Sequence, residues 1–144
     1  MAIRKPFNLQ KWIDENRDLL KPPVGNKNLY PEGEDYIVMI VGGPNARKDY
    51  HYNETEELFY QLEGEITVRI QEEGKAVDIN LGPGDMFLLP PNIPHSPMRS
   101  AGSIGLVIER VREEKHKDGL MWFCDNCNHK LHETYFKLNN IESD

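Results

Sequence analysis

Apolar side chains recur at helical spacing near the start of the chain, with polar residues such as Asp14 and Glu15 between them. Asn8 precedes this pattern and is a residue type that commonly caps helices. We therefore predict one amphipathic helix over residues 8–20, and the Lys-Pro-Pro that follows is typical of a helix end. The apolar stripe of this helix consists of Leu9, Trp12, Ile13, Leu19 and Leu20.

The pattern changes after residue 35, where short apolar or alternating runs are separated by turn residues such as Gly64 and Gly74. Many short strands with no helices between them indicate an antiparallel sandwich or barrel, so we predict an all-β fold apart from the first helix. The predicted strands cover residues 36–41, 58–62, 65–71, 76–81, 86–89 and 104–111. Residues 24–28 are interpreted as a loop, and residues 133–138 are expected to form a last edge strand.

Composition narrows the classes of partner. The chain has 144 residues, enough for one domain with a hydrophobic core, and a formal net charge of -7. An acidic chain is a poor binder of nucleic acid or anionic membranes, so we expect neither partner. No apolar run approaches the ~20 residues of a membrane span, and the N-terminus lacks the apolar core of a signal peptide. These features favour a cytoplasmic protein. The basic residues between 110 and 117, and His116 among them, are expected to face solvent.

Two histidines and one glutamate are the strongest candidates for chemistry. His51, Glu57 and His95 each lie in strand-like sequence that is closed off by turns. Two neutral imidazoles and one carboxylate can hold one face of an Fe(II) octahedron and leave the opposite face open for substrate and oxygen. Each residue taken alone is more typical of a turn or of a solvated surface, so the hypothesis depends on their joint spacing.

Strand parity associates further residues with this set. Alternate residues of a strand share a face, and Arg47, Asn53 and Phe59 have the parity of His51 and Glu57. A loop over residues 53–56 would reset that parity.

Parity also links Arg99 to His95, and it places Glu109 on the same face as two valines. Glu109 therefore points outward beside exposed valines, or inward with a proton or a cationic partner, because burial of an unpaired carboxylate is costly. Arg47 and Arg99 are the expected partners.

Residues 51–64 resemble the first motif of the cupin superfamily, and residues 84–95 resemble the second. This resemblance implies a cupin double-stranded β-helix, also described as a jelly-roll barrel. Asn53 stands where the usual motif has a second histidine, Asn92 where it has glycine, and Arg99 where it has asparagine. The missing histidine leaves a site of three protein ligands in place of four, which suits a substrate that binds the metal through two atoms.

The resemblance is closer to one family within this superfamily, the short single-cupin 3-hydroxyanthranilate 3,4-dioxygenases. It extends from Asn8 to about residue 138, and ordinary cupins lack the combination of Arg47, Arg99 and Glu109. It implies a single cupin domain over residues 1–144. The matching stretches are residues 8–13, 21–27, 42–51, 57–61, 89–99 and 107–110. Within the implied domain we expect the N-terminal helix at 8–20, a metal-binding barrel at 36–111 and a tail at 121–144.

This family resemblance also implies the chemistry. The expected enzyme is an iron-dependent dioxygenase that opens the ring of 3-hydroxyanthranilate with O2. Its product is 2-amino-3-carboxymuconate semialdehyde, the precursor of quinolinate in the kynurenine route to NAD. By the resemblance, Fe(II) is bound by His51, Glu57 and His95, and a homodimer is expected. The implied catalytic residues are Arg47, Arg99 and Glu109, and the implied substrate contacts are Arg47, Glu57, Phe59, Arg99 and Glu109. We assign the substrate carboxylate mainly to Arg99, because a guanidinium can donate two parallel hydrogen bonds.

Cys124 and Cys127 form a Cys-x-x-Cys pair, which is half of a tetrathiolate metal site. Short members of the family carry a second such pair near the C-terminus and bind iron between the two. The sequence leaves two interpretations open: a second metal, iron or zinc, at this pair, or two free thiols that can form a local disulfide.

Two other functions compete with ring cleavage: a cupin that uses its metal for a different reaction, such as thiol oxidation or sugar isomerisation, and a non-catalytic cupin that binds a small carboxylate. Asn53 and the two arginines count against the first alternative, and the lack of a helix-turn-helix pattern in the sequence weakens a regulatory version of the second.

Overall fold

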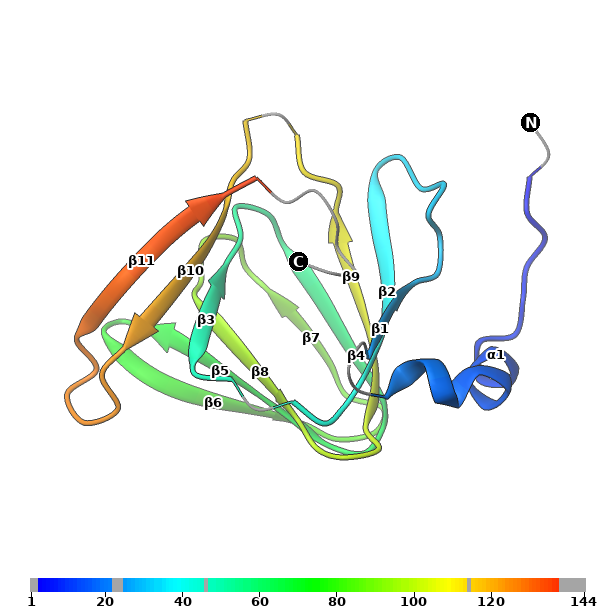
Figure 1. Ribbon diagram of the computed structural model, residues 1–144, viewed down its shortest axis with the longest axis horizontal. Coiled ribbons are helices and arrows are strands. Elements are labelled where there is room, and N and C mark those ends of the chain that lie inside the picture. Colours follow the sequence, from blue (N-terminus) through cyan, green and yellow to red (C-terminus); the bar gives the residue numbers. More distant parts are fainter. Residues whose placement is uncertain (1–2, 22–24, 46, 114, 138–144) are drawn as a thin grey trace.

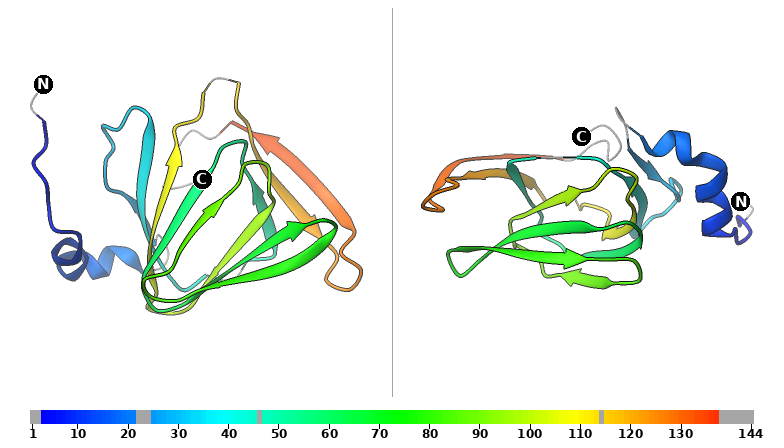
Figure 2. Two further views of the ribbon diagram at one scale, coloured as in Figure 1. Left: turned by 180° about the vertical axis from the view of Figure 1, so that it is seen from behind. Right: turned by 90° about the horizontal axis from the view of Figure 1, so that it is seen from below.

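The chain folds into two facing antiparallel sheets that form an open barrel (Figures 1 and 2). The computed structural model describes residues 3–21, 25–45, 47–113 and 115–137. The first sheet contains, in spatial order, β1 (Asn26–Asn28), β2 (Tyr36–Gly42), β9 (Ile104–Arg110), β4 (Glu57–Glu63) and β7 (Met86–Leu89). The second contains β11 (Lys130–Phe136), β10 (Asp118–Phe123), β3 (Asp49–Tyr52), β8 (His95–Arg99), β5 (Ile66–Glu72) and β6 (Lys75–Leu81).

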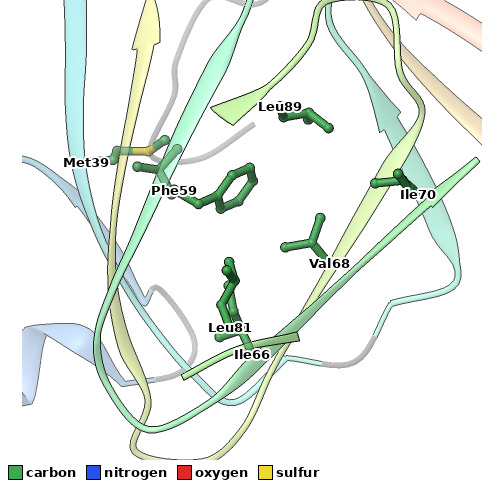
Figure 3. Packing of buried hydrophobic residues seen from close by; sticks show 8 residues of the cluster. Met39, Phe59, Ile66, Val68, Ile70, Leu81 and Leu89 are labelled. Carbon is green, nitrogen blue, oxygen red and sulfur yellow. The ribbon is translucent and has the colours of Figure 1, made fainter. Parts of the chain in front are cut away.

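Apolar side chains fill part of the space between the sheets (Figure 3). Alternate residues of β4 and β5 are buried, as expected for strands with one face in a core. Phe59 and Val68 are 1% and 0% exposed, so they anchor this layer. The buried cluster consists of Met39, Phe59, Ile66, Val68, Ile70, Leu81, Leu89 and Val107.

A short helical segment lies outside the barrel, beside the β1 end of the first sheet (Figure 1). Helix α1 (Leu9–Asn16) continues as a 3-10 helix (Arg17–Leu20), so the predicted helix is confirmed. The Asn8 side chain accepts a hydrogen bond from the backbone N–H of Lys11 at 2.8 Å, which confirms its role as the cap. A second buried cluster joins this segment to the barrel and consists of Ile13, Leu20, Leu29, Ile40 and Ile104. Within the described residues, the structure has no helix with the length and apolar character needed to cross a membrane.

The mainly β fold predicted from turn spacing is confirmed, and the six strands predicted between residues 36 and 111 are present to within one residue at each end. Strands β3 and β8 hold the strand-like sequence around His51 and His95, and two further strands, β1 and β10, are findings of the structure. The three residues of β1, interpreted as loop, pair with β2, and β10 pairs with β3. The second sheet therefore continues past residue 111, the expected end of the barrel, into the hairpin of β10 and β11.

Candidate metal and substrate site

A cavity of about 460 Å³ opens between the two sheets. This volume lies within the range of small-molecule sites, about 300–1,000 Å³. Its lining combines charged or ionisable residues with apolar residues. The charged or ionisable residues are Arg47, Asp49, His51, Glu57, His95, Arg99 and Glu109. The larger apolar residues are Met39, Val41, Pro97, Val107, Leu120 and Phe136. All six residues expected to be ligands or catalytic groups therefore line this one cavity, with Glu57 and Glu109 on the first sheet and His51, His95 and Arg99 on the second.

Strand pairing brings the three candidate metal ligands together. His51 on β3 lies directly opposite His95 on β8, and the centroids of their rings are 5.3 Å apart. Glu57 is the first residue of β4, and its neighbour across the sheet is Glu109 on β9. Residues 53–56 form an irregular connection, yet His51 and Glu57 both reach the cavity.

His95 presents one ring nitrogen to Glu57. Its Nδ1 lies 3.0 Å from the backbone carbonyl of Ile93, and its Nε2 lies 3.5 Å from Oε2 of Glu57. Both side chains are almost completely buried. Burial alone would raise the pKa of Glu57, but the charge and hydrogen bond of His95 and a hydrogen bond from Glu109 outweigh it and hold that pKa well below its usual range. A backbone carbonyl on one nitrogen is the usual way to orient a histidine that binds metal through the other.

His51 makes a different contact. Its Nε2 lies 2.5 Å from Oδ2 of Asp118, the first residue of β10. Both oxygens of Asp118 also accept from Arg112, whose Nε and Nη2 lie at 2.9 and 2.7 Å. The Arg112 side chain is only 4% exposed, so the expectation that it faces solvent is wrong. Neither Arg112 nor Asp118 was identified from the sequence.

Glu109 points inward and is 3% exposed, which decides between its two predicted orientations. Its closest cationic partner is Arg112, whose Nη1 donates to Oε1 at 2.6 Å. The expected partners, Arg47 and Arg99, do not fill this role. Burial, together with the charge and hydrogen bond of Glu57, raises the pKa of Glu109 well above its usual value, and Arg112 opposes that rise only in part. The pKa values of these two neighbouring carboxyl groups are therefore shifted in opposite directions.

The two cavity arginines differ in their partners. Arg47 forms an ion pair with Asp49, with Nη2 to Oδ2 at 2.6 Å. Arg99 is 6% exposed, and no carboxylate of the described residues forms an ion pair with its guanidinium. Burial is the largest cause that lowers the pKa of Arg99, to about 10. Its backbone is held by Asn45, whose Oδ1 accepts from the Arg99 N–H at 2.7 Å.

Phe59 and Asn53, which share the strand parity of His51 and Glu57, lie behind the cavity lining. Phe59, expected to contact substrate, belongs to the core, and its ring packs edge-on against His95 with centroids 6.4 Å apart. Asn53 is buried, and its Nδ2 lacks a hydrogen-bond partner. Neither residue is on the lining of the cavity.

The residues on the wall fit an iron site in the type of their donors. His95 Nε2 and Glu57 Oε2 converge, and His51 lies on the strand paired with that of His95. Together these side chains are the donor set of the two-histidine, one-carboxylate centres of iron oxygenases. Within the described residues, no three His, Cys, Asp or Glu side chains are close enough together to form a metal cage.

The Cys-x-x-Cys pair lies in the turn that joins β10 to β11. The backbone N–H of Cys127 points to Sγ of Cys124 at 3.4 Å, and both cysteines are free. Backbone N–H groups around Cys124, with that of Cys127 first, lower the pKa of its thiol. His132 packs its ring on Trp122 with centroids 5.4 Å apart. His116, expected in solvent, is buried at 9% exposure, and its Nδ1 accepts from the N–H of Glu113.

Known proteins of similar sequence share one enzyme name. The family model of 3-hydroxyanthranilic acid dioxygenase matches residues 1–144. A 3-hydroxyanthranilate 3,4-dioxygenase of Xanthomonas oryzae is 60% identical over 139 residues, which cover 96% of this chain and 78% of that protein. A protein of the same name from Bacillus thuringiensis is 50% identical over 137 residues, covering 94% of this chain and 76% of its own length.

Solved structures are similar in fold. A cupin-2 domain protein from Shewanella frigidimarina has a TM-score of 0.56 at 20% identity, over 72% of this chain and 100% of that one. The polyketide cyclase RemF from Streptomyces resistomycificus has a TM-score of 0.51 at 22% identity, over 66% and 70% of the two chains. At these identities the likeness concerns the fold alone, and it confirms the predicted cupin barrel.

Proposed function

The chain belongs to the 3-hydroxyanthranilic acid dioxygenase family, and from this membership we propose how its cavity holds iron and substrate. The protein is a ring-cleaving dioxygenase that acts on 3-hydroxyanthranilate with O2, and the family implies an iron cofactor. The product we infer is 2-amino-3-carboxymuconate semialdehyde, which closes to quinolinate.

We assign Fe(II) to His51, Glu57 and His95. Bound there, iron supplies a redox-active centre with open positions for the adjacent hydroxyl and amino groups of the substrate and for oxygen. The assignment is supported by the position of all three side chains in the lining of one cavity and by the contact between His95 Nε2 and Glu57. Glu57 is kept ionised, as a metal-binding carboxylate must be.

The observation that carries the substrate assignment is the buried guanidinium of Arg99. A buried cation without a carboxylate partner is costly, so its position on a cavity wall indicates that a ligand supplies the anion. The carboxylate of 3-hydroxyanthranilate matches this need, and a guanidinium can hold it through two parallel hydrogen bonds. The carboxylate thereby fixes the ring in one orientation relative to His95 and Glu57.

The other charged groups complete the surroundings of the ring. Arg47, already paired with Asp49, lies on the wall to bind the substrate hydroxyl or the oxygen. Glu109 lines the cavity and can form a hydrogen bond with a polar group of the substrate, while Arg112 keeps its carboxyl in place. The apolar wall sandwiches the ring and excludes water, which strengthens each of these polar contacts.

An anaerobic loading experiment tests this function. The metal-free protein is given Fe(II), then 3-hydroxyanthranilate, then air, and the near-ultraviolet band of the muconate semialdehyde is followed until it decays to quinolinate. The same assay on Arg99→Met tests the substrate assignment. Its matched control is Arg69→Met, which removes an exposed arginine paired with Asp78 on β5 and β6. Substrate binding to the iron protein without oxygen consumption would support the non-catalytic cupin instead. Failure to bind Fe(II) would refute the ligand assignment.

Three further expectations complete the proposal: a homodimer, a cytoplasmic location and a second metal at Cys124 and Cys127. The dimer is supported by exposed apolar side chains on the edge strand β7, where Met86 and Leu88 are 63% and 54% exposed. Light scattering of wild type and Leu88→Asp tests it. The second metal requires ligands besides the two thiolates. Metal analysis of a variant with His51, Glu57 and His95 all replaced by alanine tests it, because stoichiometric metal that remains would be assigned to the tail that carries the cysteine pair.

A further inference from the structure

A chain of buried charged groups connects the candidate ligands from behind. Arg112 uses three nitrogens: Nε and Nη2 bind both oxygens of Asp118, and Nη1 binds Glu109. Asp118 in turn contacts His51, and Glu109 shares a hydrogen bond with Glu57. The side chains of Arg112, Asp118 and Glu109 are 4%, 1% and 2% exposed. One guanidinium therefore supports both a histidine and the carboxylate of the proposed ligand set.

Strand pairing explains why these groups meet. On β10, Leu120 lies opposite His51 of β3, so Asp118, two residues earlier, lies on the same face and reaches the His51 ring diagonally. Arg112 lies two residues after the end of β9, and its guanidinium bonds both carboxylates. Because both oxygens of Asp118 are held by the planar fork of Arg112, the carboxylate cannot rotate freely. It therefore presents a fixed oxygen to the imidazole.

We propose that Asp118 and Arg112 are positioning residues that fix the ring orientation and tautomer of His51 for metal binding. The inference rests on the proposed iron site, since it assigns His51 a ligand role. A carboxylate on one imidazole nitrogen determines which nitrogen carries the proton and leaves the other with its lone pair. Arg112 acts through Asp118 and touches no proposed ligand itself. A buried ion pair is weak evidence for a role in stability, so its placement against His51 points to orientation as its purpose.

The decisive variant is Asp118→Asn, which keeps the shape of the side chain and removes the negative charge that contacts both Arg112 and His51. Arg112→Lys accompanies it, because a lysine keeps the charge and loses the fork. The controls are Asp78→Asn and Arg69→Lys, which alter an exposed pair with the same two-bond arrangement, 2.6 and 3.1 Å, on β5 and β6. His51→Gln tests the ligand assignment itself.

The measurements are Co(II) dissociation constants and the visible Co(II) spectrum, which reports ligand geometry without turnover. Asp118→Asn and Arg112→Lys are expected to weaken Co(II) binding about 10–100-fold, as loss of an outer-sphere partner does, and to shift the spectrum. The two controls are expected to match wild type. Wild-type affinity and spectrum in Asp118→Asn would overturn the positioning role.

Two results separate this inference from the proposed function. If His51→Gln weakens Co(II) and Asp118→Asn does not, the iron site stands and the positioning role is refuted. If His51→Gln leaves Co(II) binding unchanged, the ligand assignment fails and the inference fails with it. A test on the wild-type chain needs no variant: the nitrogen spectrum of 15N-histidine in metal-free protein is expected to show His51 in one fixed tautomer. Averaged tautomers would refute the inference.

Discussion

Replacement of Arg99 by methionine is expected to remove substrate binding without a loss of stability. Burial lowers the pKa of this guanidinium from 12.5 to about 10. Since one pKa unit corresponds to about 1.4 kcal/mol, the buried charge costs the folded protein ~3 kcal/mol at neutral pH. Methionine fills similar space without the charge, and the backbone of residue 99 stays bonded to Asn45. The free energy of unfolding should therefore stay the same or rise, by ~3 kcal/mol at most.

Catalysis, unlike stability, should be strongly impaired by this replacement. A hydrogen bond to a charged group contributes about 1.5–3 kcal/mol, so loss of two to the substrate carboxylate, partly offset by relief of the buried charge, should cost ~3–4 kcal/mol. That corresponds to a fall in kcat/KM of about 100- to 1,000-fold, mostly through KM. Steady-state kinetics and anaerobic substrate titration measure the loss of catalysis and binding, and urea unfolding measures the free energy of unfolding of the same sample. Arg69→Met is the control. A loss of stability above ~2 kcal/mol with kcat/KM within about tenfold of wild type would refute the reasoning and make Arg99 structural.

Three other substitutions test separate parts of the structure. Glu57→Gln removes a proposed ligand and should weaken iron binding more than the about 100-fold expected for an outer-sphere partner, as iron titration would show. Gly105→Ala places a Cβ 2.7 Å from Oε1 of Gln61 and 3.1 Å from Nη1 of Arg99, so KM should rise about tenfold while iron content stays at the wild-type level. Val68→Ala empties a position with 0% exposure and should lower the free energy of unfolding by about 2 kcal/mol in urea, with kcat unchanged.

The sequence predicted the elements whose evidence is local. The strands between residues 36 and 111 are marked by alternation and by turn residues, and both signals are contained in a few neighbouring positions. The metal and substrate candidates were found because the cupin motifs place His51, Glu57 and His95 at recognisable intervals. The inward orientation of Glu109 was one of two predicted possibilities, since its flanking valines could face either way.

What the sequence missed depends on contacts between distant residues. Arg112 lies among lysines and glutamates and looks like a solvated loop residue, because charge alone does not distinguish a surface cation from a buried one. Asp118 precedes a glycine, a pair more typical of a turn than of a strand start. Its partner His51 is 67 residues away, and no local pattern connects them. The polar triplet of β1 likewise forms a strand only because the edge of β2 is available to it.

The pairing of β3 with β10 also has a consequence for the order in which the protein is made. Ribosomes add about 5–20 residues per second, so the 67 residues that separate His51 from Asp118 take ~3–13 s to synthesise. Throughout that interval β3 lacks its longer neighbour, since its only direct partner in β8 is the single position His95. Most of the barrel is synthesised before the strand that holds His51 can be secured. A nascent chain that stalls before residue 118 would therefore present an almost complete barrel with an unfinished metal site.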